Sequence, residues 1–354
     1  MALTPLTTAL RRELQAGLAI PACPLALNAQ RRWDERHQRA LVRYYIAAGA
    51  GGLAVAVHTT QFAIRDPQHG LFQPLLELVA EEMAASAAGR DRLRIAGVCG
   101  STPQAINEVT CAAQTGYHAA LLSLGAWRTA PEADVLAHVA AVGRVLPIIG
   151  FYLQPAVGGR VLSYAFWRKL AELESVIAIK IAPFNRYQTL DVMRAVAESG
   201  RTDLALYTGN DDHIVGDLLT PYRFTVNGRI VEQRMVGGLL GHWAVWTRTA
   251  VALHAECRRV AETGSAIPLE LLRRGQAVTD ANAAFFDAAH GFAGCIAGLH
   301  EVLRRQGLLE GTWCLDPDET LSPGQAQEID RVLAAYPELN DDAFVELHRD
   351  AWLK

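Results

Sequence analysis

The chain has 354 residues, of which 51% are hydrophobic and 20% charged, and its formal net charge is −4. This composition is sufficient for a large folded core and excludes a disordered chain, and the lack of a basic excess argues against nucleic acid or an anionic membrane as a partner. The six cysteines form no CxxC pair and have no zinc-like spacing, which predicts small buried side chains in a reducing cytosol rather than disulfides or a metal site.

The N-terminal stretch LQAGLAIPACPLAL follows two arginines and loosely imitates a secretory signal. Glu13 interrupts the charged region, however, and Pro21 and Pro24 break the apolar run. We therefore expect residues 18–27 to form the first core strand. No uncharged apolar segment of 18 residues occurs later, so we expect no transmembrane helix and a cytoplasmic protein.

Short apolar runs alternate with longer amphipathic segments along the first 262 residues. Residues 34–49 predict a helix capped by Asp34 and Gly49, and residues 102–116 predict a second helix capped by Thr102, before Pro103, and by Gly116. Eight such repeats predict an α/β fold, a closed parallel (β/α)8 TIM barrel. The predicted strands are residues 18–27, 51–60, 94–100, 118–124, 145–152, 175–181, 203–209 and 236–243.

An open doubly wound sheet is the competing architecture, but no GxGxxG follows the first strand and no GxxxxGK occurs. The alternation stops near residue 262, and residues 268–354 show helical patterns. We therefore expect a barrel domain over residues 1–262 and a C-terminal helical extension over residues 263–354. The extension should pack against the barrel or against a sister subunit.

Lys180 ends the sixth apolar run, SVIAIKIAPFN, although lysine is rarely buried without a partner. The carboxyl ends of barrel strands build the active site in this architecture. Burial lowers the pKa of a lysine, and a neutral amine attacks a ketone to give a Schiff base. The structural alternative is a lysine that reaches solvent or pairs with Asp211 or Asp212, and the strand alone leaves both interpretations open.

Tyr152 ends the preceding strand, and strands ~4.8 Å apart would let it share a pocket with Lys180. A phenol beside a cationic imine can transfer protons, whereas an isolated buried tyrosine is more often structural. Thr59 and Thr60 end the second strand, where hydroxyl and backbone N–H groups can hold a carboxylate.

These residues carry a resemblance to the class I aldolase superfamily of dihydrodipicolinate synthase and N-acetylneuraminate lyase. It spans roughly residues 18–335, and its most specific part is the tyrosine and the lysine with their spacing of 28 residues. The resemblance implies a (β/α)8 barrel with C-terminal helices and a homotetramer. The matching segments are WDERHQRALVRYYIAAGAGGL, His58-Thr59-Thr60-Gln61-Phe62, Tyr152-Leu153-Gln154-Pro155, Ala178-Ile179-Lys180 and LRRQGLLEG…LSPGQAQEIDRVL.

The resemblance also implies the site residues. Lys180 would form the Schiff base with a 2-oxo acid, and Tyr152 would transfer protons. Thr59 and Thr60 would hold the substrate carboxylate, with Thr60 also linked to Tyr152.

Other positions are similar to the sugar-acid lyase branch. The segment LYTGNDD matches its G-x-D-E, which implies that Gly209 and Asp211, followed by Asp212, contact substrate hydroxyls. His242 stands at the hydroxyl residue of the eighth strand, and His58 replaces the first glycine of G-[ST]-T-G-E. Either histidine would be an added substrate or acid–base contact, or else a structural residue.

This sequence differs from the family pattern at two positions that matter for substrate binding and for proton transfer. The synthase has an arginine for a second carboxylate where this chain has Val157, and Arg160 lies three residues further on. A strict synthase activity is therefore not expected. Trp127 stands where the family often has a tyrosine delivered across a subunit contact.

We therefore expect a Schiff-base lyase that cleaves or forms a C–C bond in a small-molecule 2-oxo acid, with pyruvate as the small product. No metal or other cofactor is expected, because the imine is the electron sink. A dehydratase would use the same groups, and the sequence leaves these two reactions open. The resemblance implies a homo-oligomer, either dimer or tetramer.

Two other functions compete with a lyase. A non-catalytic sugar-acid binding protein or sensor on the same barrel is the main alternative, because the motif at residues 58–62 is altered. A metal-dependent hydrolase is disfavoured, since no His-x-His or carboxylate pair ends one strand.

Overall fold

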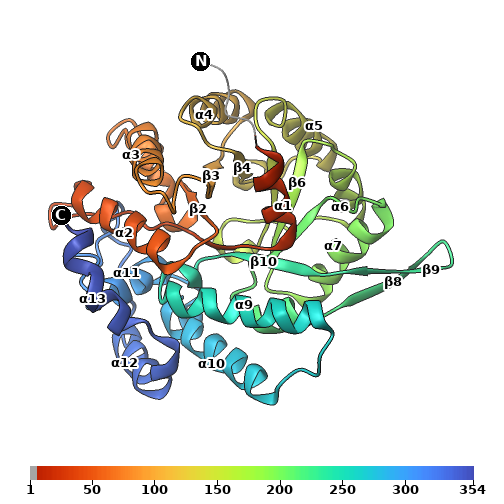
Figure 1. Cartoon of the computed structure of the whole chain (residues 1–354). Coiled ribbons are helices and arrows are strands. Elements are labelled where there is room, and N and C mark those ends of the chain that lie inside the picture. Colours follow the sequence, from red (N-terminus) through yellow and green to blue (C-terminus); the bar gives the residue numbers. More distant parts are fainter. Residues whose placement is uncertain (1–5) are drawn as a thin grey trace.

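Eight parallel strands form a closed barrel in the computed structural model, which describes residues 6–354 (Figure 1). Their hydrogen-bonded order is β1-β10-β7-β6-β5-β4-β3-β2, and a bridge between Ala22 and Ala54 closes the ring. Each predicted strand segment overlaps one of them, although four of the strands extend one residue beyond the predicted bounds, and this confirms the (β/α)8 TIM barrel. The strands are β1 (Ala19–Pro21), β2 (Gly52–Val55), β3 (Leu93–Val98), β4 (Ala119–Leu122), β5 (Ile148–Leu153), β6 (Val176–Ala182), β7 (Ala205–Thr208) and β10 (Met235–Leu240).

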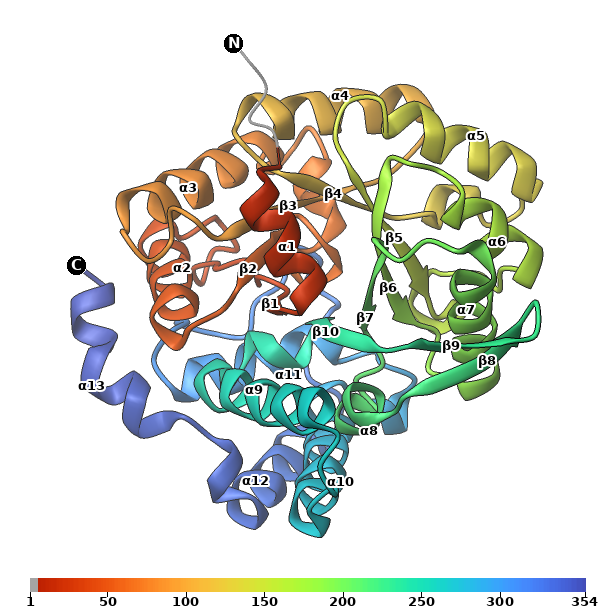
Figure 2. The ribbon, with the colours of Figure 1, turned by 45° about the vertical axis from the view of Figure 1, so that its right-hand side comes forward.

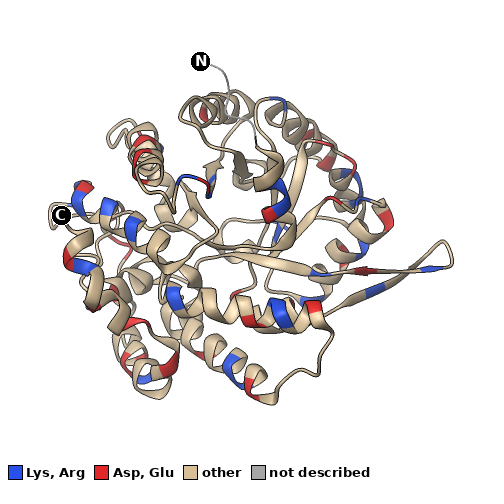
Figure 3. Ribbon diagram, viewed as in Figure 1, with Lys and Arg blue, Asp and Glu red and all other residues tan. Residues whose placement is uncertain are grey.

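The helices that follow the strands surround the barrel. Basic and acidic residues are interspersed along them (Figure 3), in keeping with the small net charge. The helices are α2 (Glu35–Ala48), α3 (Phe72–Ala85), α4 (Thr102–Gln114), α5 (Glu132–Val142), α6 (Tyr164–Ala171), α7 (Arg186–Ser199), α8 (Ile214–Leu219) and α9 (Thr247–Thr263).

The helix ends follow local sequence signals. The Asp34 side chain accepts a hydrogen bond from the His37 N–H and caps α2, which ends at Gly49 with φ 93°. The second predicted cap differs by one position, since α4 begins at Thr102 and Ser101 is its cap residue.

An additional helix, α1 (Thr8–Ala16), lies across the N-terminal end of the barrel and was not expected (Figure 1). Leu14 from this helix belongs to the apolar cluster inside the barrel. The Tyr207 hydroxyl donates a hydrogen bond to the Leu14 carbonyl at 2.7 Å and accepts one from the Leu18 N–H at 3.1 Å. This helix therefore closes the end of the barrel opposite the carboxyl ends of the strands.

An antiparallel hairpin of β8 (Tyr222–Val226) and β9 (Arg229–Gln233) is inserted between α8 and β10, and it projects from the barrel (Figure 1). This hairpin was not among the predicted elements. Its turn consists of Asn227 and Gly228 with φ 50° and 75°, and Asn-Gly between alternating residues is a strong hairpin signal. The signal was therefore available in TVNGRIV.

Residues that are neighbours in a strand belong to different apolar layers, because side chains alternate across a sheet. Ile149, Phe151 and Ile177 belong to the cluster inside the barrel. Tyr152 and Ile181 belong to the larger cluster between the strands and the helices. This alternation decides which residues reach the interior at the carboxyl ends of the strands.

The C-terminal helices confirm the predicted extension and lie along one side of the barrel (Figure 2). Helix α10 packs on α8 and α12, and α13 packs on α2, where the Tyr44 hydroxyl donates to Asp341 Oδ2 at 2.7 Å. Within residues 6–354, no helix has both the length and the apolar character that a bilayer span requires. The domain boundary at residue 262 stays a prediction. The helices of the extension are α10 (Leu269–Phe285), α11 (Cys295–Arg305), α12 (Gln325–Ala335) and α13 (Asp342–Trp352).

Candidate active site

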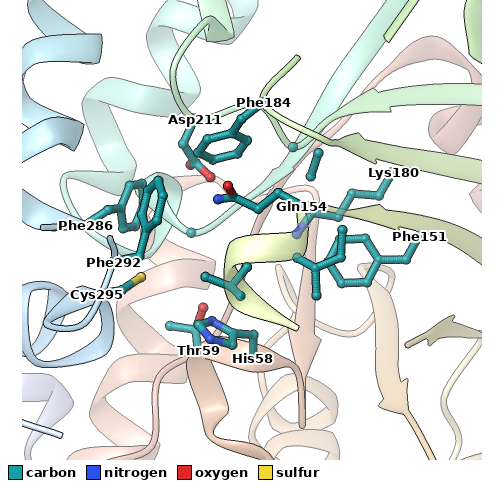
Figure 4. A pocket seen from close by; sticks show the side chains of 15 residues that line it. His58, Thr59, Phe151, Gln154, Lys180, Phe184, Asp211, Phe286, Phe292 and Cys295 are labelled. Atoms are coloured by element: carbon teal, nitrogen blue, oxygen red, sulfur yellow. The ribbon is translucent and has the colours of Figure 1, made fainter. Parts of the chain in front are cut away.

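A pocket of about 70 Å³ lies at the carboxyl ends of the strands and contains Lys180 (Figure 4). Strands β2, β5, β6, β7 and β10 and the C-terminal extension all contribute to its wall. The lining residues are His58, Thr59, Phe151, Leu153, Gln154, Val157, Lys180, Ala182, Phe184, Gly209, Asp211, Gly241, Phe286, Phe292 and Cys295.

Lys180 extends from β6 into this pocket and is partly buried. Its Nζ lies 4.5 Å from the centroid of the Phe151 ring, within cation–π distance. Burial lowers the pKa of the amine below its usual value, and the negative charge of Asp211 opposes this effect. The environment therefore favours a larger neutral fraction of the amine than a lysine has in water.

Gly209 follows β7 and lies against the lysine side chain. A Cβ at this position would lie 2.6 Å from Lys180 Cε and 2.7 Å from Ala182 Cβ. The absence of a side chain at Gly209 therefore gives the lysine its path into the pocket.

Asp211 places its carboxylate in the same pocket (Figure 4). Its Oδ1 accepts a hydrogen bond from the His242 backbone N–H at 3.0 Å, and its carbonyl accepts one from Asn282 Nδ2 of α10 at 2.7 Å. Burial raises the pKa of this carboxyl, while the hydrogen bond and the charge of Lys180 lower it to a smaller extent. Asp211 is therefore a fixed carboxyl group whose proton affinity is increased.

His58 and Thr59 enter the pocket from the short helix η1 (His58–Thr60), which follows β2. Burial, aided by the positive charge of Lys180, lowers the pKa of His58 to about 4. The imidazole is therefore neutral at pH 7. Thr59 is almost fully buried, with 5% of its surface exposed.

Thr60 does not line the pocket. Its hydroxyl donates to the Cys23 carbonyl at 2.6 Å and accepts from the Val57 N–H at 3.2 Å. These bonds tie η1 to the segment after β1, so Thr60 positions the neighbouring Thr59. The link to Tyr152 implied by the family resemblance is not formed.

Tyr152 lies on the opposite face of its strand from the pocket. The strand register pairs Phe151 with Lys180 and Tyr152 with Ile181. The Tyr152 ring packs 4.8 Å from the Trp167 ring of α6, and its hydroxyl accepts a hydrogen bond from the Leu162 N–H at 3.4 Å. We expected Tyr152 and Lys180 to share one pocket because both lie at the ends of neighbouring strands. Their side chains, however, lie on opposite faces of the sheet.

The ring of His242 is also outside the Lys180 pocket. It stacks on Phe285, with centroids 6.4 Å apart and planes at 12°, and lines a separate cavity beside α9 and α10. Burial lowers its pKa to about 4. His242 therefore contacts the site through its backbone N–H on Asp211 rather than through its side chain.

Arg160, near the position of the missing synthase arginine, does not reach the pocket either. Its Nη1 donates to the carbonyls of Trp127 and Ala130, both at 2.7 Å. Arg160 therefore stabilises the loop that follows β4. Val157, the position that lacks the arginine, does line the pocket.

The aromatic wall that the C-terminal extension supplies was not predicted from the sequence. Phe286, Phe292 and Cys295 line the pocket, and Phe292 packs edge-on against Phe184 with centroids 5.8 Å apart (Figure 4). No local pattern marks these residues, because they lie more than 100 residues beyond Lys180. Gln154 was not predicted as a site residue, although a polar residue just beyond a barrel strand is a signal for the site.

Within residues 6–354, the residues that could together bind a metal ion lie outside the Lys180 pocket. The one group of three or more possible ligands within residues 6–354 is Asp34, His37 and Glu310, and none of them lines the Lys180 pocket. The pocket itself combines one amine, one carboxyl, one neutral imidazole and an aromatic wall. This set can bind a small carbonyl compound and exchange protons with it.

A model of the dihydrodipicolinate synthetase family matches residues 16–221. No curated protein sequence matches the chain significantly. The fold is similar to that of 4-hydroxy-tetrahydrodipicolinate synthase from Methylacidiphilum fumariolicum SolV, with TM-score 0.72, 17% identity, and coverage of 93% of this chain and 98% of that one.

Two further structures with this fold come from different branches. Dihydrodipicolinate synthase from Oceanobacillus iheyensis gives TM-score 0.70 and 17% identity over 90% of this chain and 96% of that one. N-acetylneuraminate lyase from Fusobacterium nucleatum, a complex with pyruvate, gives TM-score 0.69 and 16% identity over 92% and 99%. At these identities the likeness establishes the shared fold.

Proposed function

The chain belongs to the dihydrodipicolinate synthetase family, and on this basis we propose that it is a class I Schiff-base lyase that acts on a 2-oxo acid through Lys180 and releases pyruvate. The observation that carries the proposal is the position of Lys180. Its amine lies in a small pocket at the carboxyl ends of the barrel strands, where burial lowers its pKa. The complex of N-acetylneuraminate lyase with pyruvate adds support from a protein of the same fold.

The proposed reaction begins when the neutral amine of Lys180 adds to the keto carbon, and loss of water gives a protonated imine. A base takes the proton of the C4 hydroxyl, the C3–C4 bond breaks, and its electron pair moves into the imine to give an enamine. The aldehyde leaves. The enamine then takes up a proton at C3, and water hydrolyses the imine to release pyruvate and free Lys180.

Dehydration is the second reaction that this imine supports. A base would remove a C3 proton, and the C4 hydroxyl would leave with a proton as water. The two reactions share the imine and differ in the bond that breaks, so both remain within the proposal.

Asp211 is the group that we assign to proton transfer. It lines the same pocket as Lys180, and burial raises its pKa, so its carboxylate accepts a proton more readily than an exposed one. His58 is neutral and can orient the substrate. The Thr59 hydroxyl supports binding of the 2-oxo acid carboxylate. Tyr152 takes no part in this scheme, because it does not line the pocket.

Trapping with pyruvate and borohydride tests the proposal cleanly, because the chain has three lysines and the other two, Lys169 and Lys354, are exposed. Reduction should add the mass of one reduced pyruvyl group to the intact chain, and peptide mapping should locate it on Lys180. Lys180→Ala should abolish the adduct, and Lys169→Ala is the matched control that should retain it.

The absence of an adduct in the wild-type chain, or its persistence in Lys180→Ala, would reject the lyase. If a sugar acid still bound by calorimetry without an adduct, the non-catalytic binding protein would be the correct alternative. A homo-oligomer remains part of the proposal through the family resemblance, and sedimentation equilibrium would measure it.

A further inference from the structure

A second cavity, of about 300 Å³, lies at the amino ends of the barrel strands, opposite the Lys180 pocket. Its floor comes from residues at the start of β1 and just before β2 and β3, and its wall comes from α9. The volume falls at the lower end of the ~300–1,000 Å³ that is usual for small-ligand sites. The lining residues are Gly17, Leu18, Ala19, Gly49, Gly51, Arg92, Val251, His254, Ala255, Arg258, Arg259 and Glu262.

One face of α9 supplies most of the polar groups of this cavity. His254, Arg258 and Glu262 follow one another at intervals of four residues, which places them side by side along the helix. Arg258 Nε lies 3.1 Å from Glu262 Oε1, and its Nη1 donates to the Gly17 carbonyl at 3.5 Å. These contacts hold the guanidinium of Arg258 between α9 and the start of the barrel.

Two further arginines of the lining have donors to spare. The Arg259 side chain forms no hydrogen bond or ion pair within residues 6–354, and Arg92 donates from its Nε alone, to the Ala88 carbonyl at 3.1 Å. Three arginines and one glutamate give the lining a net charge of +2. Because guanidinium groups match the oxygens of a phosphate group in geometry and charge, this lining favours a phosphate dianion.

His254 contributes a fixed hydrogen-bond acceptor to the same cavity. The residue is 6% exposed, and its ring packs edge-on against Trp243 with centroids 5.7 Å apart. Its Nε2 donates to the Val236 carbonyl at 3.0 Å. Burial lowers the pKa of the imidazole, so the ring is neutral at pH 7, and Nδ1 therefore carries the lone pair.

The Nδ1 atom of His254 has no partner in the described part of the chain. It forms no hydrogen bond there, and it is not one of the atoms that the surrounding side chains enclose completely. Because His254 lines the cavity, a ligand can reach this nitrogen. A hydroxyl group would satisfy the lone pair, whereas an oxyanion would place a second acceptor against it.

We propose that this cavity binds a small phosphate monoester that also carries a hydroxyl group. Arg92, Arg258 and Arg259 hold the phosphate, and the hydroxyl donates a hydrogen bond to His254 Nδ1. Above pH 7 the phosphate monoester is mainly a dianion, which matches the net charge of the lining. The site is separate from the Lys180 pocket, and the inference does not depend on the lyase proposal.

Three ligands of three carbons each test both halves of the site on the unmodified chain. Calorimetry at about pH 7.5 would compare glycerol 3-phosphate with propyl phosphate, which lacks the hydroxyls, and with glycerate, which has a carboxylate in place of the phosphate. We expect glycerol 3-phosphate to bind about 10-fold or more tightly than either analogue, as one hydrogen bond to a buried acceptor or one additional charge predicts. The absence of binding, or equal affinity for glycerol 3-phosphate and either analogue, would overturn the site.

Variants then locate the two contacts. His254→Phe keeps a ring against Trp243 and removes the acceptor, so the preference for glycerol 3-phosphate over propyl phosphate should fall below about 3-fold. Arg259→Gln, at an exposed position, should weaken the binding of both phosphates about 5-fold or more. Arg144→Gln, at an exposed arginine outside the cavity, is the matched control and should change neither affinity.

A full hydroxyl preference in His254→Phe, or unchanged affinities in Arg259→Gln, would contradict the assignment. The ligand series and Arg259→Gln decide the question if His254→Phe does not fold. In Lys180→Ala the affinity for glycerol 3-phosphate should equal that of the wild type, because the two cavities share no lining residue. Loss of this affinity in Lys180→Ala would place the ligand in the other pocket and refute the site.

Discussion

Phe151 and Lys180 occupy paired positions on β5 and β6, with the lysine Nζ 4.5 Å from the centroid of the phenylalanine ring. Because side chains alternate across a strand, this pairing directs Tyr152 away from the pocket towards Trp167. The pocket therefore has an aromatic wall where the family resemblance implies a phenol. In the proposed reaction, proton transfer would therefore depend on the titratable residues that line the pocket, of which Asp211 is the carboxyl.

Tyr152→Phe should therefore leave imine trapping and C–C cleavage within about 3-fold of the wild type. It should cost about 1 kcal/mol of unfolding free energy, because the Leu162 N–H loses its acceptor. Trapping rates and urea unfolding measure the two effects. Tyr207→Phe, which removes a hydroxyl at the other end of the barrel, is the control, and a 100-fold loss of cleavage in Tyr152→Phe alone would restore the role implied by the resemblance.

Asp211→Asn should separate imine formation from bond cleavage. The carboxylate raises the pKa of Lys180, so its removal should move the pH midpoint of trapping to lower pH, and trapping should persist. Cleavage should fall by about 10²–10⁴, the usual contribution of a general base. The neighbouring exposed carboxylate offers the control Asp212→Asn. Unchanged cleavage in Asp211→Asn would exclude Asp211 as the base.

Gly209→Ala should obstruct the lysine. The added Cβ would meet Lys180 Cε and Ala182 Cβ, so trapping should fall at least about 10-fold, and overpacking should cost about 1–3 kcal/mol. Gly150→Ala is the control, since its Cβ would lie 3.0 Å from Leu170 on the outer face of β5. That variant should lose stability and retain trapping. Equal trapping in the two variants would contradict this explanation of Gly209.

Acid should destabilise the fold through its buried histidines. Burial lowers the pKa of each of four histidines to about 4, against about 6.5 in the unfolded chain. Between these values the unfolded state binds more protons, so stability is lost as the pH falls from 6.5 to 4, by up to about 1.4 kcal/mol per histidine per pH unit. These residues are His58, His118, His242 and His300.

Some carboxyls act in the opposite direction. Burial raises the pKa of Asp211 and Asp341, and that of Glu319 to about 7, so their protonation stabilises the fold as the pH falls. Burial also lowers the pKa of His138 and His254 and raises that of Asp212. With six histidines against four carboxyls, the net effect should be a decrease in the urea midpoint from pH 6.5 to pH 4.5. In His300→Gln the urea midpoint should decrease less over this pH range. A urea midpoint that rises as the pH falls would contradict the expectation that the histidines outweigh the carboxyls.

Local patterns in the sequence were enough for the architecture. The eight apolar runs, the Asp34 and Gly49 caps and the position of Lys180 at a strand end all depend on hydrophobic periodicity and on residues a few positions apart. The Asn227-Gly228 hairpin is equally local, and it was missed because the expected strand–helix alternation left no place for it.

The composition of the pocket depends on long-range packing. Strand register and closure of the ring select Phe151 instead of Tyr152 for the interior, and a shift of one residue would exchange the two faces. Phe286, Phe292 and Cys295 reach Lys180 because α10 packs on α8 and the extension folds back over the barrel. Local periodicity identifies a strand and its apolar character, but the contacts that orient its side chains come from elements far away in the chain, and these set the chemistry around Lys180.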